Sequence, residues 1–243
     1  MDAKIAGGDR IWILVAGRWT ESTVTLAFFA EGITHVICSG HASLIYNERG
    51  MYLKTARRVV ACASSQAGLT YSICFYGESG HDYGRIMATR YLNPPFKAHH
   101  NQIRNGPVVG IPGWSKAEIA HAESIISRRV RMYCRDGFVD GQIVTFFRKD
   151  VDPPIVFKRQ DANNEHIVSH DAFSDIFEVI SISGGPFGGK GDSGSPVILL
   201  GETGNIEDPV FLVGSLIGVQ KVEALGGDFY VGYVGYARRH VFS

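Results

Sequence analysis

The sequence predicts an all-β protein whose many short strands form barrels or a sandwich. Short apolar runs rich in β-branched and aromatic residues recur along the chain, and such residues favour half-buried pleated surfaces. Glycine is abundant, at 29 of 243 residues, which is typical of tight turns and hairpins between short strands. Hydrophobic residues make up 45% of the chain, so one large domain or two small ones can bury a substantial core.

The first half of the chain reads mainly as short strands. A middle segment, residues 93–114, is rich in Pro, Asn and Gly and is interpreted as a connection. Residues 115–118, Ser-Lys-Ala-Glu, form a capping-box pattern that opens an apolar-periodic stretch through Ile125 and Ile126, which predicts one short helix. The predicted strands before it are 10–15, 22–29, 34–38, 58–62 and 70–76.

Strand signals resume in the second half. Asp136 and Gly137 form a turn between two strand-like runs, which predicts a hairpin. The long segment 150–175 has no assigned role. The predicted strands of this half are 130–134, 142–147, 177–182, 210–217 and 229–234.

Composition argues against several classes of function. The net charge is zero and the pI is about 7.1, so a nucleic-acid partner is not indicated. No apolar run is long enough to predict a membrane span. The four cysteines form no CxxC pair and show no zinc spacing, and the adjacent His99 and His100 are a poor pair for one ion. We therefore expect no metal and no cofactor.

The most specific motif is residues 191–197, Gly-Asp-Ser-Gly-Ser-Pro-Val. Glycines on both sides of Ser193 allow a tight turn and keep bulk away from its hydroxyl. The backbone amides of Gly191 and Ser193 can then point into one oxyanion hole. A phosphate-binding loop at 184–191 is rejected because Gly191 stands where Ser or Thr must ligate magnesium. The GxSxG elbow of lipases fails because Ser195 replaces its second glycine.

This loop resembles the nucleophile loop of the chymotrypsin-like serine peptidases, Gly-Asp-Ser-Gly-Gly/Ser-Pro. The resemblance implies two six-stranded antiparallel β-barrels, with a short helix between or beside them. The N-terminal barrel would span residues 1–105 and carry His and Asp, and the C-terminal barrel would span 106–243 and carry the nucleophile. Residues 141–143, Gly-Gln-Ile, are similar to the start of the second barrel in compact microbial and viral members.

The resemblance also assigns a catalytic triad. His41 follows the strand-like run 36–40 and has the small neighbours that the family's base usually has, whereas His35 lies inside the strand. Asp82 is the only aspartate between His41 and the middle connection, with Glu78 as the fallback carboxylate. The expected activity is peptide hydrolysis through an acyl-enzyme on Ser193, with His41 as base and Asp82 orienting its ring.

Specificity is inferred from the same resemblance. The floor of the family's primary pocket maps onto Phe187, so cleavage after Arg or Lys is not expected. The pocket wall maps onto Ile217, Gly218 and Val219, which favours a small or apolar residue before the scissile bond. The substrate is expected to bind as an extended strand along residues 214–218. The oligomeric state is not indicated.

Three further interpretations concern processing and setting. Lys4-Ile5 resembles the activation site of trypsin-type zymogens, whose new N-terminus would pair with Asp192, but we favour coincidence. Ala42 and Gly189 stand where secreted relatives usually carry cysteines, and no secretory signal is seen, so a cytoplasmic or viral protein is expected. The sequence leaves open a polyprotein-processing enzyme that cuts mainly in cis, and a catalytically silent domain used for binding or assembly.

Overall fold

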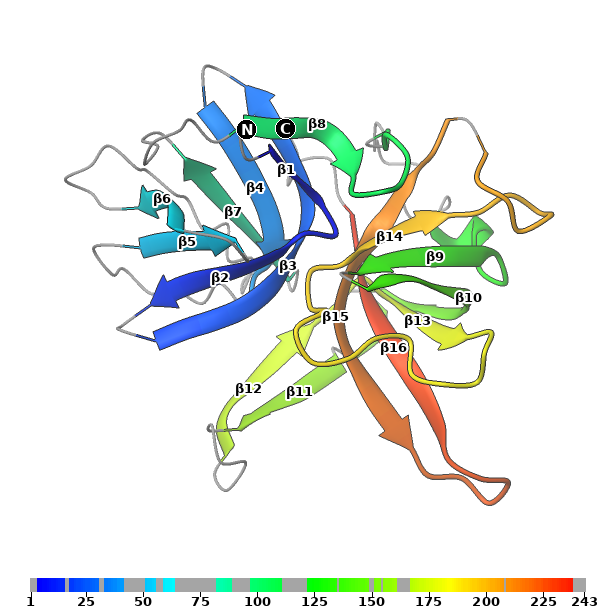
Figure 1. The fold of residues 1–243 in the computed structure, drawn as a ribbon. Helices are drawn as coiled ribbons and strands as arrows, with labels where there is room; N and C mark the ends of the chain where they lie inside the picture. Colours follow the sequence, from blue (N-terminus) through cyan, green and yellow to red (C-terminus); the bar gives the residue numbers. More distant parts are fainter. Residues whose placement is uncertain are drawn as a thin grey trace.

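A computed structural model describes most of the chain as β-strands joined by turns (Figure 1). The described residues are 4–15, 18–30, 33–41, 51–55, 59–63, 82–88, 97–110, 122–134, 136–148, 151–153, 155–160, 167–207 and 209–237. The predicted strand 70–76, the helix start at 115–118 and the fallback residue Glu78 lie outside these residues.

The expectation of an all-β chain is confirmed, and residues 122–124 are the one helical turn among the described residues. The strands before the middle of the chain are β1 (Lys4–Gly7), β2 (Arg10–Val15), β3 (Arg18–Ala30), β4 (Ile33–Ser39), β5 (Met51–Thr55), β6 (Val59–Ala63), β7 (Tyr83–Ala88) and β8 (Lys97–Ile103). The later strands are β9 (Arg129–Cys134), β10 (Gly137–Phe147), β11 (Ile155–Gln160), β12 (Ile167–Phe173), β13 (Ile176–Ser181), β14 (Pro196–Leu199), β15 (Leu212–Val222) and β16 (Phe229–Tyr236).

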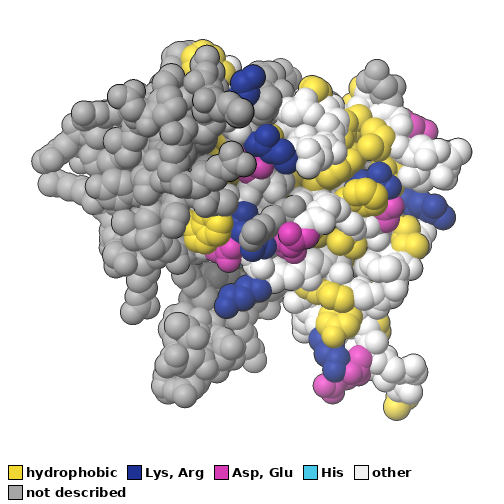
Figure 2. All heavy atoms as spheres, in the orientation of Figure 1, with side chains coloured by type: hydrophobic (Ala, Val, Ile, Leu, Met, Phe, Trp, Pro, Cys, Tyr) yellow, Lys and Arg dark blue, Asp and Glu magenta, His cyan; other side chains and the backbone are white. Residues whose placement is uncertain are grey.

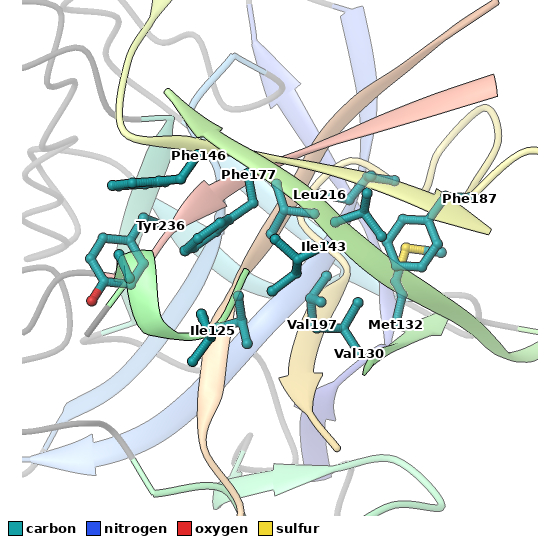
Figure 3. Packing of buried hydrophobic residues seen from close by; sticks show 14 residues of the cluster. Ile125, Val130, Met132, Ile143, Phe146, Phe177, Phe187, Val197, Leu216 and Tyr236 are labelled. Atoms are coloured by element: carbon teal, nitrogen blue, oxygen red, sulfur yellow. The ribbon is translucent and has the colours of Figure 1, made fainter. Parts of the chain in front are cut away.

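The C-terminal half forms a closed six-stranded barrel in the order β10-β13-β16-β15-β14-β9. Its interior is filled by aromatic and branched side chains, and Figure 3 shows Phe146, Phe177 and Tyr236 gathered at one end. The rings of Phe177 and Tyr236 meet edge to face at 5.4 Å, an arrangement that adds to the stabilisation from burial. The predicted hairpin at Asp136-Gly137 joins β9 to β10.

The N-terminal half forms a six-stranded antiparallel sheet in the order β6-β5-β2-β3-β4-β7. Its edge strands β6 and β7 come near each other, but the described residues record no pairing that closes this sheet into a second barrel. The two halves pack against each other through a buried cluster to which both contribute, including Leu26 and Ile37 from one side and Ile198 and Leu212 from the other.

Two segments contain strands that the sequence does not predict. The segment 93–114, interpreted as a connection, contains β8, which pairs in parallel with β1 and includes His99 and His100. The segment 150–175, which had no assigned role, contains the antiparallel hairpin β11–β12. The hydrogen bonds between paired strands are made by the backbone, so polar or irregular sequences can form strands as well. Hydrophobic periodicity therefore does not predict these strands.

Candidate active site

The loop that carries Ser193 is a tight turn held by its own backbone. The Ser195 N–H donates to the Asp192 carbonyl at 2.8 Å, and the Asp192 N–H donates to the Gly189 carbonyl at 3.1 Å. Gly191 and Gly194 have φ angles of 90° and 93°, a left-handed region that side chains rarely adopt. A Cβ on Gly194 would also collide with the Thr23 carbonyl oxygen of β3, so both glycines are required where they stand.

Strand β3 of the N-terminal half holds this loop in place through hydrogen bonds across the interface between the two halves of the chain. The Thr23 hydroxyl donates to the Gly191 carbonyl at 2.8 Å, and the Thr23 N–H donates to the Ser193 carbonyl at 2.8 Å. The hydroxyls of Ser22 and Thr25 donate to the carbonyls of Ser193 and Gly194 at 3.0 and 2.7 Å. These three side chains are almost fully buried, so the position of the nucleophile depends on a polar stripe within a strand.

His41, Asp82 and Ser193 are brought together at the boundary between the two halves. His41 Nε2 lies 3.2 Å from Ser193 Oγ, and His41 Nδ1 lies 2.6 Å from Asp82 Oδ2. The Asp82 carboxylate must accept from Nδ1, so the proton sits on Nδ1 and Nε2 is left to accept the Ser193 proton. Both distances lie within the reach required for proton transfer.

The Asp82 carboxylate is held by more than the imidazole. Its Oδ1 accepts from the His41 backbone N–H at 2.6 Å, and its Oδ2 accepts from the Ser39 hydroxyl at 3.2 Å. Its side chain is only 1% exposed, so these donors replace the water that the charge has lost. A Cβ on Gly40 would come within 3.0 Å of Asp82 Oδ1, so the small residue before His41 leaves space for the carboxylate.

An oxyanion hole needs backbone N–H groups that are not already bonded to another acceptor. The N–H groups of Asp192, Gly194 and Ser195 each donate to a backbone carbonyl. Among the described residues, no acceptor is recorded for the N–H groups of Gly191 and Ser193. Within residues 191–195, these two N–H groups are therefore the donors available to a developing negative charge.

Several solved structures of proteases have a similar arrangement of strands. The chain superposes on alpha-lytic protease homolog N4 with a TM-score of 0.55 and 14% identity, covering 99% of this chain and 96% of that one. For the chymotrypsin of Cellulomonas bogoriensis the TM-score is 0.53 at 14% identity, with coverages of 98% and 94%. For protease A of Thermobifida fusca it is 0.52 at 13% identity, with coverages of 96% and 92%. The chain has the chymotrypsin-like fold. Its sequence matches no protein-family model and no curated protein.

In this chymotrypsin-like chain, Arg10 is the cation that faces Asp192. Its guanidinium lies 3.6 Å from Asp192 Oδ1 and 3.0 Å from Glu21 Oε1. Burial raises the pKa of the Asp192 carboxyl, and the Gly189 N–H and the Arg10 guanidinium oppose that rise. In this uncleaved chain Ile5 lies fully buried within β1, which pairs with β8, and Arg10 rather than an Ile5 ammonium faces Asp192.

The residues predicted to line the primary pocket have different positions. Phe187 is fully buried in the core of the C-terminal barrel, where its ring packs against the backbone of Gly141 and Gly232. Figure 3 shows it beside Met132 and Leu216. The Ile217 carbonyl oxygen lies 3.1 Å from Ser193 Oγ, and Val219 is half-buried against the same core. Phe187 therefore packs in the core behind the predicted pocket wall, whereas the Ile217 carbonyl lies next to the Ser193 side chain.

The remaining expectations concern absences. Within the described ranges, no group of three or more His, Cys, Asp and Glu side chains could hold a metal ion. No helix in the described part of the chain is long and apolar enough to cross a membrane. Cys38 is buried and Cys134 is half-buried, and neither forms a disulfide.

Sequence reasoning missed three contributors to the site: Arg10, Ser39 and the β3 hydroxyls. Arg10 and Ser39 give no local signal, because each acts on a group that folding brings close. The hydroxyls of Ser22, Thr23 and Thr25 did leave a signal, since three polar residues stand next to the apolar run of residues 26–30 in the same strand.

Proposed function

We propose that this chain is a serine endopeptidase that works through an acyl-enzyme on Ser193. The observation that carries the proposal is the hydrogen-bonded series Ser193–His41–Asp82, set beside two backbone amides that have no acceptor recorded among the described residues. A serine hydroxyl is a weak nucleophile alone and gains reactivity from a base that a third group orients.

The proposed reaction uses each group in turn. His41 takes the Ser193 proton as Oγ attacks the substrate carbonyl, and Asp82 stabilises the imidazolium that forms. The Gly191 and Ser193 amides stabilise the oxyanion of the tetrahedral intermediate, each donor contributing roughly 10²–10³ in rate. His41 then protonates the leaving amine, and water repeats the sequence on the acyl-enzyme with His41 as base.

The surroundings of Ser193 support a preference for small or apolar residues before the scissile bond. The side chains behind the loop are apolar, namely Met132, Phe187, Leu216 and Val219, and a Cβ on Gly188 would already collide with Leu216. No charged group among the described residues of this wall would match an Arg or Lys side chain.

The test is cleavage of an unfolded protein, read as new peptide termini by mass spectrometry. Wild type should cleave, Ser193→Ala should not, and Ser195→Ala should retain cleavage. Ser195 is the matched control because it is a fully buried serine two residues along the same loop, and its hydroxyl has no partner among the described residues. Absence of cleavage by folded wild type would contradict the proposal. New termini confined to the enzyme's own chain would restrict it to processing in cis.

A further inference from the structure

The residue after Asp82 reaches across the boundary between the two halves of the chain. Tyr83 is the first residue of β7, and its hydroxyl donates at 2.7 Å to the carbonyl of Gly235 in β16 of the C-terminal barrel. Figure 1 shows the start of β7 near the end of β16. The tyrosine side chain is almost fully buried in the cluster to which both halves contribute. This hydrogen bond is therefore shielded from water, which makes it stronger than the same bond at the surface.

On the C-terminal side, the carbonyl that accepts this bond is tied to the nucleophile loop. Gly235 pairs with Ser215 of β15. The next residue, Leu216, donates its N–H to the Ser195 carbonyl at 3.0 Å and accepts at its own carbonyl from the Gly194 N–H at 2.7 Å. The tyrosine hydroxyl is thus connected to both residues that follow the nucleophile through one pair of adjacent strands.

On the N-terminal side, the backbone of Tyr83 is held against the residues that carry the catalytic base. The Gly40 N–H donates to the Asp82 carbonyl at 3.2 Å, and the His41 N–H donates to Asp82 Oδ1 at 2.6 Å. A Cβ on Gly40 would lie 3.1 Å from the Tyr83 nitrogen, so the two segments pack closely. His41 and Asp82 are therefore expected to move as one unit, and the hydroxyl of Tyr83 joins that unit to the opposite half.

The Tyr83 hydroxyl remains a donor at neutral pH. Burial raises the pKa of Tyr83, and the charge of Asp82 adds to the rise. Charged groups also join the two halves: Arg10 of β2 lies 3.6 Å from Asp192. Figure 2 shows basic and acidic side chains beside one another near the middle of the face that it draws. Ions in solution weaken pairs of charges, whereas the bond from a neutral, buried phenol does not depend on salt.

We propose that Tyr83 is a positioning residue for the reaction, and that its hydrogen bond to Gly235 sets the distance between His41 and Ser193. The bonds from β3 hold the nucleophile loop, but they do not come from the strands beside the catalytic base. His41 Nε2 lies 3.2 Å from Ser193 Oγ, and a misplacement of about 1 Å costs about 10²-fold in rate. This inference rests on the proposed function and adds to it a residue that contacts neither the substrate nor the reacting atoms.

The first test is Tyr83→Phe, which removes the hydroxyl and keeps the ring. Because the other contacts between the halves remain, we expect a shift of a fraction of an ångström. The rate constant for reaction with a fluorophosphonate and kcat on a peptide should then fall about tenfold, with KM little changed. Tyr233→Phe is the matched control, since the buried Tyr233 donates its hydroxyl at 3.2 Å to Gln220 within one barrel, and it should keep wild-type rates. Wild-type rates in folded Tyr83→Phe would overturn the inference.

A pH profile separates positioning from an effect on charge. The contacts between His41 and Asp82 lie on one side of the boundary, so Tyr83→Phe should lower kcat/KM by the same factor at each pH and at low and high salt. A shifted midpoint would show that Tyr83 acts on the charge of Asp82 and would overturn the inference.

Restoring a donor tests the hydrogen bond itself. A para-aminophenylalanine placed at position 83 returns an N–H to the place of the hydroxyl, and it should recover most of the rate that Tyr83→Phe loses. A folded protein with this side chain and no recovery would contradict a role for the bond to Gly235.

The fluorophosphonate reaction also distinguishes the two possible failures. If wild type and Tyr83→Phe react at the same rate, the inference about Tyr83 is wrong and the proposed function stands. If folded wild type does not react, the proposed function is wrong and the inference falls with it.

Discussion

The Thr23 hydroxyl is predicted to position the backbone that forms the oxyanion hole. The substitution Thr23→Val removes this hydroxyl with almost no change in the shape of the side chain. The hydroxyl donates to the Gly191 carbonyl at 2.8 Å from a side chain that is 1% exposed. Leaving that carbonyl without its donor costs about 1–3 kcal/mol of unfolding free energy. Complete loss of one hole donor lowers kcat about 10²–10³-fold. Because Thr23→Val lets the Gly191 peptide shift rather than removing its N–H, we expect a loss of about tenfold, equal to about 1.4 kcal/mol of activation free energy.

Thr25→Val is the matched control for this prediction. Its hydroxyl is equally buried on the same strand and donates at 2.7 Å to the Gly194 carbonyl, whose residue lies outside the hole. Both variants should lose similar stability in urea melts, but only Thr23→Val should lose kcat on a peptide substrate with KM little changed. Equal kcat values in the two variants would refute the reasoning.

The remaining predictions concern the triad, the ion pair, the loop and the pocket wall. Asp82→Asn should lower kcat about 10⁴-fold while the protein stays folded, measured by single-turnover kinetics beside circular dichroism, because the amide favours the wrong imidazole tautomer; a loss below tenfold would count against the triad. Arg10→Met should raise the pKa of Asp192 further. The folded variant then holds the Asp192 proton up to a higher pH than wild type does. Its unfolding free energy should therefore fall furthest below that of wild type near neutral pH, where Asp192 is ionised without its cation. The difference should shrink as the pH falls and Asp192 becomes protonated. A deficit independent of pH would contradict this role for the pair. Gly194→Ala should fail to accumulate as folded protein, because its positive φ and the nearby Thr23 carbonyl leave no place for a methyl group; a folded, active variant would show that the turn can relax. Val219→Gly should raise the rate on substrates with large apolar residues before the scissile bond relative to alanine, and an unchanged ratio would remove Val219 from the wall.

Local patterns predicted much of the chain's architecture. Strands β2, β4, β9 and β16 were predicted from apolar runs, because packing against a core dictates both the composition and the length of such segments. Strand β8 was missed because its sequence, Lys-Ala-His-His-Asn-Gln-Ile, carries no alternation, and its pairing with β1 depends on a partner far away in the sequence. The four-residue strand β14 was hidden by the motif that precedes it.

The candidate site likewise contains residues that local sequence motifs predict and contacts that they do not. His41, Asp82 and Ser193 each lie in a short glycine-containing motif that can be recognised from the sequence. In the structure, the three side chains form one series of hydrogen bonds. The contacts of Thr23 with Gly191 and of Arg10 with Asp192 join residues from opposite halves of the chain. No local pattern predicts such pairs, because their energy depends on the packing of one half against the other.

The most direct measurement of the central claim is the reaction of folded protein with a fluorophosphonate, read by intact mass. An activated serine at position 193 predicts a single adduct on wild type and on Ser195→Ala, a much slower adduct on His41→Ala, and none on Ser193→Ala. Absence of an adduct on folded wild type, or an adduct that persists in Ser193→Ala, would contradict the account.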